Sequence, residues 1–326
     1  AELKYTEYFT IGNSGEPDID VQPLQLSLLC GSQEPVQGFA VSSEKESLIE
    51  PQQSTSGPVP PRGVLSKNTV AIQAEAEGMT HTLPVPGYGW RHGCGPTAVG
   101  MVVGYYDSLG YKDLIPGEAG SQTAEVNQAI ASQGSVQDPR HYEDYSLPDD
   151  SAGTILLPDK SELPAGDEHS HDSIADFMKT SWSSVDNLYG WSWSDDIGPA
   201  FQDYVNLKNP DYEPSYQFYS KTDNSLTWEV LIQEIDAERP MVFLVDTEGD
   251  GQTDHFVTVV GYRDTPVQQY GCLDTWESYD VVRWCDFATI QTGQSWGVWG
   301  GWSFQLASLI QNSFTIANEG TALLTV

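Results

Sequence analysis

A glycine-flanked cysteine stands at the start of an apolar stretch, in the segment HGCGPTAVGMVVGYYD that begins at residue 92. Pro96 suits the first turn of a helix, where the missing N–H of proline needs no partner. Cys94 therefore lies at a predicted helix N-terminus, where unpaired N–H groups and the helix dipole stabilise a thiolate. The flanking glycines would let another backbone approach the sulfur closely. This pattern favours a reactive cysteine, because a structural cysteine buried in a core needs neither the glycines nor the helix start.

A nucleophilic cysteine needs a base, and the base needs a group that orients it. His255 begins a predicted strand, HFVTVVGY, and Asp274 lies in the next predicted strand, YGCLDTW. Opposed side chains on neighbouring antiparallel strands lie about 5 Å apart, so one carboxylate can hold one imidazole. The order cysteine, histidine, acid, with the cysteine on a helix, is typical of papain-like enzymes.

The predicted elements favour an α+β fold, because helices come first and a run of antiparallel strands follows. The clearest predicted helix is LTWEVLIQEIDAE, residues 226–238, whose apolar residues recur at helical spacing and which Pro240 ends. Predicted strands are MVFLV, HFVTVVGY, YGCLDTW, YDVVRWCDF and WGVWGGWSF. We therefore expect the helix that bears Cys94 to pack on an antiparallel sheet that bears His255 and Asp274.

The charge balance narrows the classes of partner. The 326 residues include 14 Lys and Arg against 47 Asp and Glu, a formal net charge of −33. So acidic a surface repels phosphate backbones, which argues against nucleic acid as a partner. No apolar run approaches the roughly 20 residues of a membrane helix, so no membrane insertion is expected. The acidity favours an extracellular setting, and the chain does not open on a signal peptide.

The two ends of the chain share a short pattern, FTIGNSG from Phe9 and FTIANEG from Phe314. Each predicts a strand, a turn and a second strand, as in the first hairpin of immunoglobulin-like modules, although chance similarity is the alternative. A Ser/Pro/Gly-rich stretch follows the first copy and is typical of a linker. The predicted organisation is a β-rich, partly immunoglobulin-like segment at 1–53, a linker at 54–75, a main domain at 76–310 with an insertion at about 115–222, and the start of a further β module of the same longer chain at 311–326.

Four acidic residues crowd the loop before His255. They are Asp246, Glu248, Asp250 and Asp254. Their spacing and the glycine at the sixth position match part of an EF-hand-type calcium loop, although the usual glutamate at the last position is missing. Four carboxylates within nine residues would repel one another without a cation. The alternative is a plain hairpin turn, which the Asp-Gly pair inside the loop also predicts. Structural calcium is therefore a hypothesis, and no cofactor is expected to be required for the chemistry.

The four cysteines are too few and too far apart for a disulfide scaffold, and no CxxC spacing points to zinc or redox work. A hairpin turning at residues 278–279 would set Cys272 opposite Cys285, close enough for a disulfide. Such a bond would indicate an oxidising compartment. The alternative is two packed thiols in a reduced protein, and Cys30 is left unpaired in either case.

The blocks HGCGPTAVGMVVGYYD, DHFVTVVGY and LDTWES resemble those of papain-clan cysteine peptidases of the bacteriocin-leader-processing type. They are most similar to the secreted bacterial C39-like relatives, over roughly residues 80–305. The resemblance implies a papain-like fold, a peptide or protein substrate and a secreted or cell-surface location. It also implies Cys94 as nucleophile, His255 as general base and acid, and Asp274 as the residue that orients the histidine.

Two departures from the family pattern concern the oxyanion hole and the spacing. The family usually has glutamine six residues before the cysteine, where this chain has Tyr88. The tyrosine hydroxyl, Trp90 or His92 could donate instead, beside the N–H of Cys94 itself. In addition, 161 residues (255 − 94) separate the cysteine from the histidine. This separation predicts a loop-rich insertion or lid that sets substrate specificity.

Three functions stay open at this stage. The first is a thiol hydrolase that cleaves peptide bonds through a thioacyl intermediate. The second keeps the same three residues but transfers the acyl group or cleaves another amide, because papain-like sites serve such reactions too. The third is a surface binding module that has lost catalysis, which the change at Tyr88 would allow. A thiol at Cys94 that does not react at neutral pH would indicate the third.

Overall fold

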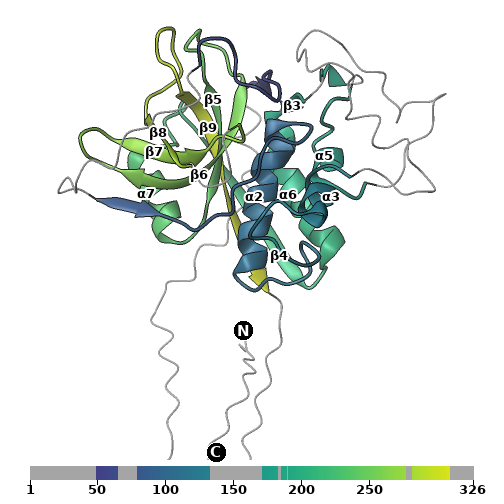
Figure 1. Ribbon diagram of the computed structural model, residues 1–326. Coiled ribbons are helices and arrows are strands. Elements are labelled where there is room, and N and C mark those ends of the chain that lie inside the picture. Colours follow the sequence, from purple (N-terminus) through teal and green to yellow (C-terminus); the bar gives the residue numbers. More distant parts are fainter. Residues whose placement is uncertain are drawn as a thin grey trace, which may run out of the picture. The chain divides into compact units, whose positions relative to one another are not determined.

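The computed structural model describes residues 49–64, 79–132, 171–182, 185–188, 190–276 and 281–308 (Figure 1). The chain divides into two compact units, Val41–Ala307 and a second one made of Ala1–Ala40 with Ser308–Val326. Nearly all described residues belong to the first unit. The predicted immunoglobulin-like segment up to residue 48, the end of the predicted linker and the β module predicted at 311–326 lie outside the described residues. No helix in the described ranges is long and apolar enough to cross a membrane.

A seven-stranded sheet forms one layer of the fold. Its main path runs β4-β9-β5-β6-β7-β8, and β2 pairs with the far end of β6. The strands are β2 (Thr80–Thr82), β4 (Tyr212–Ser220), β5 (Met241–Asp246), β6 (His255–Arg263), β7 (Gln269–Leu273), β8 (Arg283–Asp286) and β9 (Gly297–Ser308). The ladders from β9 through β8 are antiparallel, as is the β2–β6 pair. Every residue of β5 is buried, so this strand forms the middle of the sheet.

The helices cover the sheet. They are α2 (Cys94–Ser108), α3 (Ala124–Ile130), α5 (Ile174–Phe177), α6 (Ile197–Lys208) and α7 (Trp228–Asp236), with the short 3-10 helix η2 (Ser194–Asp196). Figure 1 shows α2, α3, α5 and α6 gathered on one side, with α7 against the sheet away from α2. Helix α7 confirms the helix predicted within residues 226–238, and the Thr227 side chain caps it by accepting from Val230 N–H.

Helix α2 is the centre of the fold. It is buried from Cys94 to Tyr106, as expected of a helix that is apolar all round and packed on every side. At Gly100 a Cβ atom would lie 2.7 Å from Ile130 Cγ1, so only glycine lets α3 approach this closely. Because α2 is packed on all sides, the position of its first residue, Cys94, is fixed.

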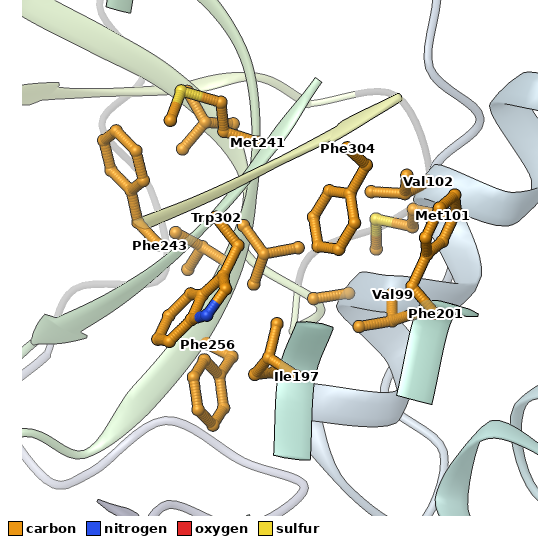
Figure 2. Close-up of a cluster of buried hydrophobic side chains, with 14 of the residues drawn as sticks. Val99, Met101, Val102, Ile197, Phe201, Met241, Phe243, Phe256, Trp302 and Phe304 are labelled. Atoms are coloured by element: carbon orange, nitrogen blue, oxygen red, sulfur yellow. The ribbon is translucent and has the colours of Figure 1, made fainter. Parts of the chain in front are cut away.

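The core between helices and sheet is drawn in Figure 2. Its labelled side chains are Val99, Met101 and Val102 from α2, Ile197 and Phe201 from α6, and Met241, Phe243, Phe256, Trp302 and Phe304 from the strands. Phe256 is the second residue of β6 and packs so tightly that a Cβ at Gly95 would lie 3.3 Å from its ring. Thr258 Oγ1 also donates to the carbonyl of Ala98 at 3.0 Å. These contacts hold the start of β6 against the start of α2.

The predicted insertion at 115–222 is not a separate lid in its described parts. Helices α3, α5 and α6 pack on α2, and β4 forms one edge of the sheet. Tyr204 of α6 is fully buried and donates its hydroxyl hydrogen to the Leu114 carbonyl at 3.0 Å. The described parts of this region thus belong to the main domain, and a role for it in substrate specificity stays a prediction. The α+β fold, with a Cys-bearing helix packed on an antiparallel sheet, is confirmed.

Candidate active site

Cys94 is the first residue of α2, the position that the sequence predicts. Gly93 before it has φ 155°, and a Cβ there would lie 2.8 Å from both Pro96 and Thr180. The backbone can therefore make this turn into the helix only with glycine at that position. The Cys94 sulfur accepts a hydrogen bond from Phe256 N–H at 3.4 Å, so it faces the start of β6.

His255 is the first residue of β6, fully buried, and both ring nitrogens are hydrogen-bonded. Nε2 lies 2.7 Å from the backbone oxygen of Asp274, and Nδ1 lies 2.6 Å from the hydroxyl of Ser56. A carbonyl oxygen can only accept, so Nε2 carries the hydrogen of the neutral ring. Nδ1 is then the basic nitrogen, and it accepts the Ser56 hydroxyl hydrogen. Proton transfer at this site can therefore take place at Nδ1.

The Ser56 hydroxyl links the imidazole to the thiol. It lies 2.6 Å from His255 Nδ1, and the Ser54 and Ser56 side chains both lower the pKa of the Cys94 thiol, which places them beside the sulfur. The predicted nucleophile and the predicted base thus converge on one hydroxyl oxygen.

Asp274 orients His255 through its backbone oxygen, whereas the sequence predicted the carboxylate. The carboxylate oxygen Oδ2 instead accepts from Arg283 Nε at 2.8 Å and Nη2 at 2.7 Å, in a buried ion pair. Oδ1 accepts from Trp276 N–H at 3.1 Å. The reason is the strand register, which pairs Thr258 with Leu273 and so brings Trp276, two residues beyond the predicted partner, toward His255.

Trp276 covers the imidazole. Its ring stacks on that of His255 with centroids 3.6 Å apart and planes inclined by 13°. Thr275 has φ 64°, unusual for a β-branched residue, and this turn lets the Asp274 oxygen and the Trp276 ring both reach the histidine. The Asp-Thr-Trp block is evident in the sequence, but no role for its tryptophan was predicted. The sign that pointed to it was its place two residues after the aspartate.

Burial keeps both groups of the pair neutral. Desolvation raises the pKa of the Cys94 thiol, and the nearby Asp254 carboxylate adds to this, while hydrogen bonds from Phe256 N–H and two serines oppose it. Desolvation lowers the pKa of His255 from 6.5 to about 4, although its bond to Asp274 works the other way. Near pH 7 the covered site therefore holds a thiol and a neutral imidazole.

The lowered pKa of His255 predicts a loss of stability in acid. Between pH 6.5 and about 4 the unfolded chain binds a proton that the folded imidazole does not. The free energy of unfolding therefore falls by about 3 kcal/mol across this window as the pH drops. Urea unfolding of the wild type and of His255→Gln at pH 7 and pH 4 measures it, because the variant lacks this component. An unchanged difference between the two proteins at both pH values would contradict the burial argument.

Residues 51–57 cross the site, although the sequence predicted a linker from residue 54. Strand β1 (Gln53–Ser54) pairs antiparallel with β3 (Ser192–Trp193), and in Figure 1 the segment is the dark purple trace beside β3. Ser54 is fully buried and Ser56 is 5% exposed. Cys94 itself has no exposed surface. Composition misled the prediction, because the bonds that hold this segment come from residues more than 130 positions away.

Comparison with known proteins identifies the family of this chain. The family model described as Peptidase C39-like matches residues 79–304 of the 326, far more than half of the chain. The chain belongs to the Peptidase C39-like family. A crystal structure of a protein described as a C39-like peptidase from Bacillus anthracis is similar at 12% identity, covering 71% of this chain and 99% of that one, with a TM-score of 0.32. No curated protein matches the chain significantly.

The C39-like domain does not use Tyr88 at the predicted oxyanion position. Its hydroxyl donates to the Ala119 carbonyl, and burial raises its pKa. The same hydroxyl lies against Gly104, where a Cβ would be 2.1 Å from it. Gly104 is ten residues along α2 from Cys94, which corresponds to about 15 Å. The tyrosine ring therefore packs against the helix well away from the sulfur, and the prediction for Tyr88 is wrong.

Trp90 and His92 lie in the loop that enters α2. The N–H of Trp90 donates to the Thr275 carbonyl at 2.7 Å, which ties this loop to the turn that orients the histidine. His92 is buried, and desolvation with the nearby Arg91 lowers its pKa to about 3, so its ring is neutral near pH 7. A role for either residue in binding an oxyanion stays a prediction.

The acidic loop satisfies its carboxylates with its own backbone and side chains. Asp246 accepts from the N–H groups of Gly249 and Gly251 at 2.6 Å each, and both carboxylate oxygens of Asp254 accept from Thr247. Burial raises the pKa of Asp254 to about 7, so it is partly neutral. Among the described residues, no group of three or more His, Cys, Asp or Glu side chains is placed to hold a metal ion. The structure thus does not assemble the predicted calcium ligands, Asp246, Glu248, Asp250 and Asp254.

The predicted register of the last hairpin is also wrong. Cys272 lies opposite Arg283, and Cys285 lies opposite Tyr270, two positions away from the predicted cross-strand pair. Both thiols are buried and not joined by a disulfide. The offset follows from the buried pair between Arg283 and Asp274, which needs the arginine near the end of β7.

Proposed function

We propose that this chain is a thiol peptidase in which Cys94 is the nucleophile and Nδ1 of His255 is the general base. The observation that supports it most directly is the position of the Ser56 hydroxyl, which lies 2.6 Å from His255 Nδ1 and beside the Cys94 sulfur, while that sulfur accepts from Phe256 N–H. A substrate group or a water placed there would meet both reactive groups at once. Membership of a peptidase family makes a peptide bond the substrate class.

The reaction proceeds in two halves. His255 Nδ1 takes the thiol proton while the Cys94 sulfur bonds to the carbonyl carbon of the peptide. The C–N bond then breaks, and the imidazolium returns the proton to the leaving amine. Water attacks the resulting thioester, giving a proton to Nδ1. The acid product leaves, and the sulfur recovers its proton.

The surrounding residues position these steps. The Asp274 oxygen accepts from Nε2–H in both charge states of the ring, so Nδ1 stays the nitrogen that exchanges the proton. Trp276 stacks on the imidazole and excludes water from one face of it. The N–H of Cys94, at the start of α2, is our candidate oxyanion donor, and one such donor typically lowers the barrier by about 3 kcal/mol.

Product analysis tests this proposal. The full chain and the full chain carrying Thr55→Pro, which loosens the covering segment, are incubated with a peptide library in ¹⁸O-water, with and without an amine acceptor. We expect new carboxyl termini that carry ¹⁸O and no amine adducts. Because no metal takes part in the chemistry proposed, an added chelator should leave the rate unchanged.

Two outcomes would contradict the proposal. Products that carry the added amine would indicate an acyltransferase that uses the same site. An absence of cleavage, together with no adduct of a peptidyl thiol-reactive probe at Cys94 in either protein, would indicate a binding module without catalysis.

A further inference from the structure

We propose that residues 52–57 occupy the substrate groove of the enzyme and hold it latent, and that a peptide substrate replaces them as an extended strand. The proposal rests on the function above and assigns both the regulation and the substrate-binding mode of the same site. It follows from which atoms hold the segment, how deeply its side chains are buried and what it excludes from Cys94.

One wall of the groove is β3 with the start of η2. Gln52 N–H donates to Ser194 Oγ at 3.0 Å, and Ser194 N–H donates to the Gln52 carbonyl at 2.8 Å. Two residues on, Ser54 is paired with Ser192. The segment is thus added to β3 as a short antiparallel strand.

The other wall is the turn that precedes His255. The carbonyl of Asp254 accepts from Thr55 N–H at 2.8 Å and from Ser56 N–H at 2.9 Å. Thr253 Oγ1 donates to the Gln53 carbonyl, and Trp276 Nε1 donates to the Gly57 carbonyl, both at 2.8 Å. The segment is therefore held from both sides, and one of its anchors is the same tryptophan that stacks on His255.

Most of these bonds reach the backbone of the segment and not its side chains. An extended peptide of almost any sequence presents the same N–H and carbonyl groups, as in other cases where a peptide adds a strand to a sheet edge. Specificity for the peptide sequence would come from the two positions whose side chains point inward. Ser54 is fully buried and Ser56 is 5% exposed, so both positions accept small side chains only. The substrate class is an extended peptide with small residues two apart.

Occupation by the segment and reaction at Cys94 exclude each other. A carbonyl carbon must come within about 3.5 Å of the sulfur to be attacked. The Ser54 and Ser56 side chains lie beside that sulfur, and the Ser56 hydroxyl donates to the lone pair of His255 Nδ1 at 2.6 Å. With the segment in place the nucleophile has no exposed surface. The groove must empty before a substrate can enter.

Alkylation of Cys94 by iodoacetamide, followed residue by residue with mass spectrometry on the full chain, tests the proposal. Thr55→Pro removes one hydrogen bond to Asp254 and should raise the labelling rate about tenfold. Ser56→Arg cannot bury its side chain in the groove and should raise the rate by more than about 100-fold. The matched control is Val59→Arg, because Val59 lies two residues beyond the segment and is 64% exposed, and its rate should equal that of the wild type.

A synthetic peptide of residues 52–59, added to the Ser56→Arg variant, should restore protection of Cys94. The same peptide with arginine in place of its second inward-pointing serine should not. The buried thiols of Cys272 and Cys285 report on folding, and they should stay unlabelled throughout. If these thiols are also labelled in Ser56→Arg, that variant has unfolded. The labelling rate of Cys94 in Thr55→Pro then tests the proposal.

The readout separates this proposal from the proposed function. Rapid labelling of Cys94 in the variants without peptide cleavage would support the proposal that residues 52–57 occupy the groove. The same result would contradict the proposed peptidase function. Equal labelling in the wild type and Thr55→Pro, with peptide cleavage by both, would contradict the proposal that residues 52–57 occupy the groove. The proposed peptidase function would then still be supported.

Discussion

Cys94→Ala is expected to lower the rate of peptide cleavage by about 10⁵-fold, because it removes the only atom proposed to bond to the substrate. The comparison is made in the Thr55→Pro background, so that the covering segment limits both proteins equally. The measurement is single-turnover cleavage of one peptide from the library experiment. Binding of the peptide should persist, since the groove that holds its backbone is untouched.

The matched control for this prediction is Cys285→Ala. Cys285 is also buried and its thiol is also reduced, but it lies on β8 and outside the groove. We expect its cleavage rate to stay within about twofold of the parent, because no step uses this thiol. Cleavage by Cys94→Ala at the parent rate would refute the assignment of the nucleophile.

Arg283→Met is expected to lower the free energy of unfolding by about 3–5 kcal/mol. The side chains of Arg283 and Asp274 are 4% and 1% exposed, so the substitution leaves the buried Asp274 carboxylate without its arginine. The double variant Arg283→Met/Asp274→Asn should recover most of the loss, because it removes both charges. Urea unfolding at pH 7 measures all three proteins.

Lys179→Met is the control for this prediction. Lys179 pairs with Asp196 at 2.7 Å, but the lysine side chain is 42% exposed. Loss of so exposed a pair should cost less than about 1 kcal/mol. Equal losses in Lys179→Met and Arg283→Met would show that burial does not set the strength of the Arg283 pair.

Arg283→Met should also slow cleavage, since Asp274 orients the histidine from the same short turn.

Several features of this protein could be predicted because their causes are local. The start of α2 at Cys94 follows from a proline and two glycines that are neighbours of the cysteine in the chain. The strand that begins at His255 follows from an apolar run, and α7 follows from its helical spacing and from Pro240 beyond its end. Hydrophobic patterning also sufficed for the α+β class, because buried faces must pack on one another.

Other features depend on which residues meet across the fold. The carboxylate of Asp274 pairs with Arg283 because the β6–β7 register brings Trp276 to the histidine, and one shift of register changes every opposed pair. Tyr88 is directed away from the sulfur by the packing of Gly104 ten residues along the helix. Neither the strand register nor the packing partner of a side chain can be predicted from the few residues around a motif.

The sequence alone determined that a helix begins at Cys94 and that a strand begins at His255. Tertiary structure alone decided what stands between them, since Ser56 reaches His255 across 199 positions of chain. Local composition made residues 54–57 look like a linker, because serine, proline and glycine form little structure by themselves. Hydrogen bonds from two distant walls hold them in the groove, and no short-range pattern encodes such bonds.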